Sequence, residues 1–248
     1  MENIELLFVF LFGLCIGSFL NVVIYRLPKQ KSIISPPSSC PACGTRIKPW
    51  HNIPIIGWLI LKGRCASCGA KISVRYPIIE LLTGIIAVIV YYKTGLNIFF
   101  IINFAVFSTL LALSMIDFDY KAVPDSLNLL ALTLAFFNST DILNNFTNAL
   151  ILMGGMSLIR YYVSYIIKRE AMGEGDIIVA GTMGALLGVK LALIAIFIGS
   201  ALAILPSIYN RIKNNDFELP FIPFLALGTF IVWIFNGYFE LLWSNIYG

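Results

Sequence analysis

The sequence has few charged residues and a single histidine. Asp, Glu, Lys and Arg make up 12% of its 248 residues, whereas 59% are hydrophobic. So little charge cannot cover the surface of a soluble domain, and the chain is therefore expected to use the lipid bilayer as its solvent. The lone His51 argues against a Ser–His or Cys–His nucleophile pair. A glycine-rich loop of the dinucleotide-binding type is also missing.

Long apolar runs recur along the chain and predict an all-α polytopic membrane protein with about eight transmembrane helices. The first run lacks a small-residue cleavage site and is interpreted as a retained helix. Two of the runs are short for a span and are compatible with half-buried helices beside a water-filled cavity. The eight predicted helices cover residues 4–25, 78–92, 98–116, 126–137 (short), 149–167, 177–189 (short), 191–209 and 221–243.

The basic residues predict the orientation of these helices. Of 17 Lys and Arg, nine lie from Arg26 to Arg75, five lie in every second loop thereafter, two lie on the opposite side, and Arg160 lies inside a predicted helix near its basic end. Because positive loops stay in the cytoplasm, we expect both termini outside and the long first loop inside. The net charge of +4 reflects this topology. No nucleic-acid partner is expected, since the basic residues belong to no readout element.

The first loop carries two cysteine motifs, SCPACG and RCASCG. Cys40/Cys43 and Cys65/Cys68 are two C-x-x-C pairs with 21 residues between them, which is typical of a closed, structural four-cysteine zinc site. A loop of this size cannot build its own core, so a metal would stabilise it. Two disulfides or a thiol-disulfide oxidoreductase are the alternatives. The cytoplasmic placement argues against stable disulfides, and redox C-x-x-C motifs usually occur singly at a helix N-terminus rather than as matched pairs.

The sequence thus divides into three predicted parts. Residues 1–25 form the first transmembrane helix, and residues 26–77 form a small zinc-ribbon-like cytoplasmic loop. Residues 78–248 form a multi-helix membrane domain, which carries the candidate reactive acids.

Acids next to apolar runs are the candidate reactive groups, because a carboxylate at the edge of the hydrocarbon is costly. Asp117 ends the third apolar run and is expected at the membrane boundary. Asp119 points about 200° away on a helix and is expected to be solvated. Asp125 follows a proline and precedes SLNLLAL, which favours a helix N-cap.

Asp176 closes the stretch MGEGD, at the start of another apolar run. An N-cap is again the simplest interpretation. Two glycines, Gly173 and Gly175, are a costly way to build a cap, but they permit close approach of a neighbouring helix or an extended peptide. This pattern favours a functional acid.

Two carboxylates at matching depth on different helices would suit aspartic-type hydrolysis. Two close Asp side chains cannot both ionise, so one holds a proton while the other activates a water. Asp117 and Asp176 both fall at the predicted cytoplasmic boundary. An ion-coupled transporter that uses the same acids as pathway charges is the non-enzymatic alternative, although it gives no reason for the cysteine loop.

The motifs together resemble one family, the type IV prepilin peptidases, which are bifunctional leader peptidases and N-methyltransferases of the bacterial GxGD aspartic class. The resemblance runs over almost the whole chain, with two small departures, Gly57 and Ile222. The motifs, in order, are GSFLNVVIYRLP (17–28), SCPACG, NIPIIGWLILKG (52–63), RCASCG, SVRYPIIELLTG (73–84), MIDFDYKAVPD, MGEGD and PFIPFLALG (220–228).

The resemblance implies that Asp117 and Asp176 are the catalytic pair, with Gly173 and Gly175 in support. The implied substrates are prepilins and pseudopilins, cut after a basic leader at the cytoplasmic face of the inner membrane. It also implies methylation of the new N-terminus with S-adenosylmethionine, in the amino-terminal region. Membrane lipid and a pilus or type II secretion machine are the implied partners. The role of Glu80, in RYPIIELL, stays open between packing, an ion pair with Arg26 or Arg75, and methyl transfer.

Overall fold

The computed structural model describes residues 2–214 and 219–247. The chain divides into two compact units, Met1–Leu96 (unit 1) and Asn97–Gly248 (unit 2). Within the described residues, the regular structure is helical, and two isolated bridges in unit 1 are the only β pairing. The all-α prediction is confirmed.

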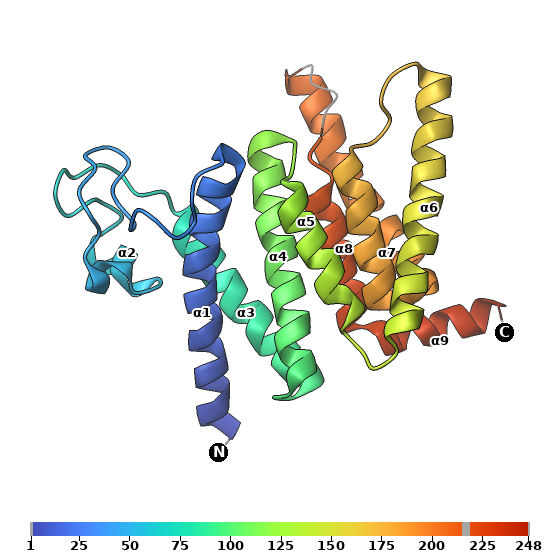
Figure 1. Ribbon diagram of the computed structural model, residues 1–248, viewed down its shortest axis with the longest axis horizontal. Coiled ribbons are helices and arrows are strands. Elements are labelled where there is room, and N and C mark those ends of the chain that lie inside the picture. Colours follow the sequence, from blue (N-terminus) through green and yellow to red (C-terminus); the bar gives the residue numbers. More distant parts are fainter. Residues whose placement is uncertain (1, 215–218, 248) are drawn as a thin grey trace. The chain divides into compact units, whose positions relative to one another are not determined.

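Unit 1 is built on a pair of packed helices, α1 (Glu2–Arg26) and α3 (Arg75–Thr94). Both are long and apolar, and glycines let their backbones approach (Figure 1). A Cβ added at Gly13 would lie 2.8 Å from the Cα of Gly84, and one added at Gly17 would lie 2.6 Å from the Cα of Glu80. Such close contacts between small residues stabilise helix pairs in lipid, where burial of apolar surface gains little.

The loop between these helices contains only short elements, η1 (Leu27–Lys29), η2 (Pro49–Asn52) and α2 (Ile56–Ile60). A side-chain hydrogen bond joins two distant parts of this loop: the Trp58 indole N–H donates to the carbonyl of Ile72 at 3.2 Å. Polar and turn-forming residues dominate the rest, so the loop lacks an apolar core of its own.

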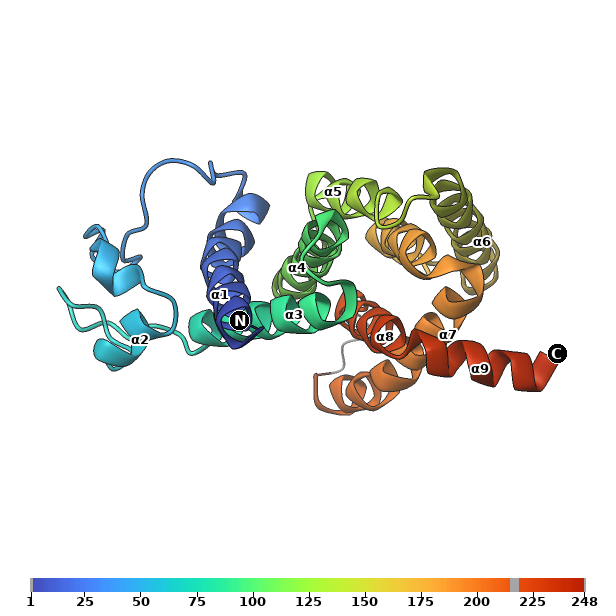
Figure 2. The same cartoon turned by 90° about the horizontal axis from the view of Figure 1, so that it is seen from below.

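Unit 2 is a bundle in which α7 (Glu174–Asn214) packs against α5 (Asp125–Phe136), α6 (Ile142–Ile167) and α8 (Ile222–Ile234). The first helix of this unit, α4 (Ile98–Tyr120), packs against α5 and α8. Viewed nearly end-on, α7 lies between α6 and α8 (Figure 2).

Glycines on α7 again explain the close packing. A Cβ at Gly184 would lie 2.6 Å from the carbonyl oxygen of Asn148 on α6, and one at Gly199 would lie 2.7 Å from that of Phe224 on α8. Fully buried apolar side chains fill the bundle, among them Leu110, Leu113 and Met183.

The predicted count of eight spans is not confirmed. Among the described residues, five helices are long and apolar enough to cross a membrane, or six if α8 and α9 (Asn236–Tyr247), which meet at a bend of 83°, count as one span. The chain is therefore a multi-pass membrane protein with fewer spans than the apolar runs suggest. The runs at 177–189 and 191–209 both belong to α7, where Gly188 (φ 74°, ψ 163°) interrupts the helical backbone, and α5 has only 12 residues.

Candidate active site and metal centre

Asp117 lies in the last turn of α4, where apolar neighbours bury it to 6% exposure. Its Oδ2 accepts a hydrogen bond from the backbone N–H of Ile222 at 3.1 Å. Ile222 is the first residue of α8, so its N–H has no partner within the helix. Asp117 thus satisfies the N-terminus of a helix 105 residues further along the chain. The sequence does not predict this bond, although Ile222 belongs to PFIPFLALG, one of the motifs that carry the family resemblance.

Asp176 lies in the first turn of α7. Its Oδ2 accepts the backbone N–H of Gly173, immediately before the helix, at 3.2 Å. This is one half of a capping box, and Gly173 has no side chain with which to return the second bond. The simpler interpretation of Asp176 as a helix cap is thus partly correct. Asp176 caps the start of α7 from inside the first turn, and it uses one oxygen of its carboxylate to do so.

Ile222 connects the two acids. Its N–H binds Asp117, and its Cδ1 would lie 3.7 Å from a Cβ added at Gly175, the residue before Asp176. The structure therefore places Asp117 and the residue before Asp176 against the same residue of α8, although the two acids are 59 positions apart in the chain.

Gly175 provides the close approach that its position predicted. A Cβ there would lie 2.6 Å from Cγ2 of Val123, in the connection between α4 and α5. On the same side, the Nδ2 of Asn128 donates to the Gly175 carbonyl at 2.9 Å. A side chain at position 175 would push the start of α7 away from both neighbours.

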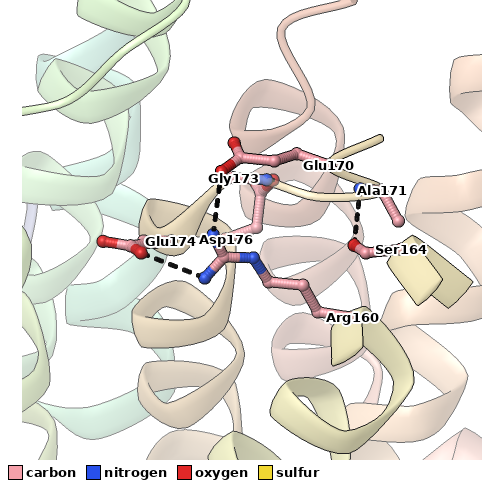
Figure 3. A network of polar contacts seen from close by, with 7 residues as sticks. All are labelled: Arg160, Ser164, Glu170, Ala171, Gly173, Glu174 and Asp176. Carbon is pink, nitrogen blue, oxygen red and sulfur yellow. Dashed lines mark hydrogen bonds and ion pairs between the residues drawn. The ribbon is translucent and has the colours of Figure 1, made fainter. Parts of the chain in front are cut away.

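The loop before α7 is held on its other side by α6 (Figure 3). The Arg160 guanidinium pairs with Glu174 at 3.2 Å and with Glu170 at 3.7 Å. The Ala171 N–H donates to the Ser164 hydroxyl at 3.0 Å. Sequence reasoning missed Arg160 and Asn128, because nothing in the spacing of either residue points to MGEGD.

A groove of about 460 Å³ adjoins this network. Its walls come mainly from polar and aromatic side chains of α6, and its edge reaches the residue next to Asp176. The lining residues are Ser157, Arg160, Tyr161, Ser164, Tyr165, Glu170 and Ile177.

Two further acids, Asp119 and Asp125, follow Asp117 in the chain, and both are exposed at the surface. Asp119 is exposed, as predicted. Asp125 is exposed too, but the prediction that it caps α5 is wrong. Pro124 occupies the N-cap position and Asp125 the first turn, where its charge favours the positive end of the helix.

The four cysteines of the unit 1 loop converge on one point. The Sγ atoms of Cys40, Cys43, Cys65 and Cys68 all lie within 4.8 Å of one another, and those of Cys40 and Cys68 are 3.8 Å apart. Four sulfurs arranged tetrahedrally at about 2.3 Å from a metal would be about 3.8 Å apart. The cluster could therefore hold a tetrahedral metal ion.

The two motifs fold into nearly identical turns. In the first, Cys40 N–H donates to Thr45 and Gly44 N–H to Cys40, at 3.0 and 2.8 Å. In the second, Cys65 N–H donates to Ala70 and Gly69 N–H to Cys65, at 2.8 and 2.9 Å. Both glycines have a positive φ, 69° and 72°, which a residue with a side chain rarely adopts. The glycine after each pair therefore sets the geometry of the turn.

The thiols differ in their tendency to ionise. Hydrogen bonding to Thr45 lowers the pKa of Cys43 to about 6. At Cys68 the Ala70 amide favours the thiolate, but the thiols of Cys43 and Cys65 raise its pKa to about 11. Four thiolates at one point repel each other, and a bound cation would compensate this repulsion.

Glu80, on α3, is a buried acid in unit 1. Its Oε2 accepts the backbone N–H of Ile55 at 2.7 Å, and the Ser18 hydroxyl also bonds to the carboxylate. Ile55 has a positive φ of 60°, which is rare for a β-branched residue. Glu80 therefore links the cysteine loop to the helix pair.

Comparisons with known proteins find a family match in each of the two units. The bacterial peptidase A24 N-terminal domain matches residues 11–94, and the type IV leader peptidase family matches residues 104–208. A prepilin leader peptidase/N-methyltransferase of Dichelobacter nodosus is 34% identical over 93% of this chain and 91% of its own length. The protein of that name in Pseudomonas aeruginosa is 32% identical over 95% and 89%. No solved structure matches the chain.

The matches cover both units and confirm the resemblance seen in the motifs. Together they show that the chain is an enzyme that belongs to the type IV leader peptidase family.

Proposed function

We propose that the chain cleaves the leader from prepilins and pseudopilins with Asp117 and Asp176, and then methylates the new N-terminus. The observation that supports the pair most directly is Ile222, which contacts Asp117 through its N–H and lies against Gly175 with its side chain. The names of the relatives support both activities.

In the proposed cleavage, one carboxylate takes a proton from a water, and the water attacks the peptide carbonyl. The other acid, protonated, donates to the developing carbonyl oxygen and thereby stabilises the tetrahedral intermediate. When the intermediate collapses, the C–N bond breaks, the carbonyl oxygen returns its proton to the acid that gave it, and the proton taken from the water passes to the leaving amine. Ile222 N–H keeps Asp117 oriented, and Gly173 N–H does the same for Asp176. A Cβ at Gly173 would meet only the carboxylate of Asp176, so this glycine leaves room there for the extended peptide, whereas Gly175 lets α7 pack against Val123 and Asn128.

The groove along α6 is the proposed approach of the substrate to Asp176. Its lining includes Glu170, and Arg160 of the same lining pairs with Glu174; the side chains of these two acids are 84% and 81% exposed. These carboxylates suit the basic leader, while the apolar helix of the substrate would remain in the bilayer. The lipid bilayer and a pilus or type II secretion machine are the other proposed partners.

Unit 1 is the proposed methyltransferase unit, and zinc is the proposed metal of its four cysteines, because sulfur ligands with tetrahedral spacing favour it. S-adenosylmethionine would supply an activated methyl group when bound. Glu80 does not identify the donor site, because its carboxylate already accepts hydrogen bonds from Ile55 and Ser18.

The proposed location is the inner membrane of a bacterium, with the cysteine loop and the acid pair facing the cytoplasm. The excess of Lys and Arg in the first loop supports this orientation. A thiol-disulfide exchanger is the weaker alternative, because the four sulfurs meet at one point instead of forming two separate pairs. A transporter would need no such cluster.

The test uses purified wild-type protein, Asp117→Asn and Asp176→Asn with a basic-leader prepilin, with and without S-adenosylmethionine. Mass spectrometry of the products should show that each variant loses cleavage while it keeps its metal content. Wild-type product should gain about 14 Da per methyl group when the donor is present. A variant that cleaves at a near wild-type rate would refute the acid pair.

A further inference from the structure

Asn128 is a polar side chain in the interior of unit 2 that the proposed mechanism leaves unused. It lies on α5 and is 0% exposed. Its Nδ2 donates to the Gly175 carbonyl at 2.9 Å, and its Oδ1 has no hydrogen-bond partner within the described residues. Because a carbonyl can only accept, this contact fixes which end of the amide faces α7.

The carbonyl that Asn128 holds belongs to the peptide group that joins Gly175 to Asp176. Fixing that peptide group fixes the backbone from which the Asp176 side chain projects. The Gly173 N–H restrains one carboxylate oxygen, but it belongs to the same turn and cannot anchor that turn to another helix. Asn128 provides such an anchor from α5.

The packing around Gly175 makes this anchor precise. A Cβ on Gly175 would lie 3.5 Å from the Nδ2 of Asn128 and 2.6 Å from Val123, so the start of α7 lies directly against α5. A buried amide with an unpaired oxygen is unfavourable for folding alone, and an apolar side chain of similar shape would fill the position without that penalty. What distinguishes Asn128 is the bond from its amide to the residue before Asp176, and this bond points to a function.

We infer that Asn128 is a positioning residue for peptide cleavage, which holds Asp176 at the geometry that the acid pair requires. This inference rests on the proposed function of Asp117 and Asp176. Because Asn128 acts through the backbone of the reactive acid, its loss should slow the chemical step and leave substrate binding nearly unchanged.

The test is Asn128→Leu, which has a similar volume and no polar atoms. We expect kcat for prepilin cleavage to fall about 10- to 100-fold while KM changes less than about threefold. Asn128→Asp should retain a donor only while its carboxyl group is protonated. Its kcat should therefore approach the wild-type value at acid pH and fall below it as pH rises.

The chain offers a matched control in Asn103 on α4. It is 3% exposed, its Nδ2 donates to the Phe99 carbonyl at 2.8 Å, and its Oδ1 is likewise without a partner in the described structure. It precedes Asp117 by 14 residues, roughly 21 Å along a helix. Asn103→Leu makes the same chemical change in the same unit, so it should leave kcat unchanged.

The outcomes separate the inference from the proposed function. If Asn128→Leu keeps the wild-type kcat while Asp176→Asn is inactive, the role of Asn128 is refuted and the acid pair stands. If Asn128→Leu and Asn103→Leu lower kcat equally, the effect is structural and the role is also refuted. If Asp176→Asn still cleaves, the acid pair itself is wrong.

Discussion

The two units assemble their sites in different ways. In unit 1 the four candidate metal ligands come from two short turns, each closed by local backbone bonds and a glycine of positive φ. In unit 2 the candidate acids come from the end of one helix and the start of another, and each acid depends on a backbone N–H for its orientation. A local turn makes the first site, and tertiary packing of a membrane bundle makes the second.

This difference determines what each site tolerates. The cysteine turns have little apolar core, so the metal would provide most of the stability of the loop. The candidate acids lie in a tightly packed helical bundle, where small backbone shifts would misplace them. The two sites should therefore fail independently, and for different reasons.

Removal of the metal is the largest expected effect. Structural zinc sites contribute on the order of 10 kcal/mol to the folding of a small domain. Cys65→Ser should abolish metal binding, measured by elemental analysis, and unfold the loop, measured by protease cutting between residues 30 and 72. Prepilin cleavage by unit 2 should persist.

Cys15→Ser is the control for that change, because Cys15 lies on α1 outside the four-sulfur cluster. It should keep the metal and an intact loop. A Cys65→Ser protein that loses cleavage together with its metal would show that the two sites are not independent.

A side chain at Gly175 should have the next largest effect. The Cβ of Gly175→Val would overlap Val123 and move the start of α7, so we expect kcat for cleavage to fall about 100-fold or more. Metal content should not change. Gly155→Val on α6 is the matched control, since a Cβ there meets no atom within 4 Å. Equal losses of kcat in both variants would contradict the steric explanation.

The sequence predicted the local site better than the assembled one. Cys40, Cys43, Cys65 and Cys68 could be grouped from their spacing, because each turn is encoded by six consecutive residues. Asp117 and Asp176 stay a predicted pair of acids at apolar boundaries, supported by Ile222, which lies next to both Asp117 and Gly175.

Their neighbours could not be predicted. The bond from Ile222 to Asp117, and the anchors from Asn128 and Arg160, depend on which helices pack together. The count of eight spans is not confirmed, for a related reason. Hydropathy measures apolar length, and although the runs 177–189 and 191–209 meet next to the break at Gly188, it cannot show that α8 and α9 meet at a bend.

The smallest expected effect is that of Arg160, and it separates the two anchors of the MGEGD loop. Arg160 is 22% exposed, but its partners Glu170 and Glu174 are 84% and 81% exposed, so water screens both pairs and each contributes about 1 kcal/mol or less. Arg160→Met should therefore lower kcat/KM for cleavage about two- to fivefold at low salt, and the difference from wild type should shrink as salt increases. Lys190→Met removes one exposed positive charge far along α7 and should have no effect. A loss for Arg160→Met as large as that for Asn128→Leu would mean that α6, and not α5, holds Asp176 in place.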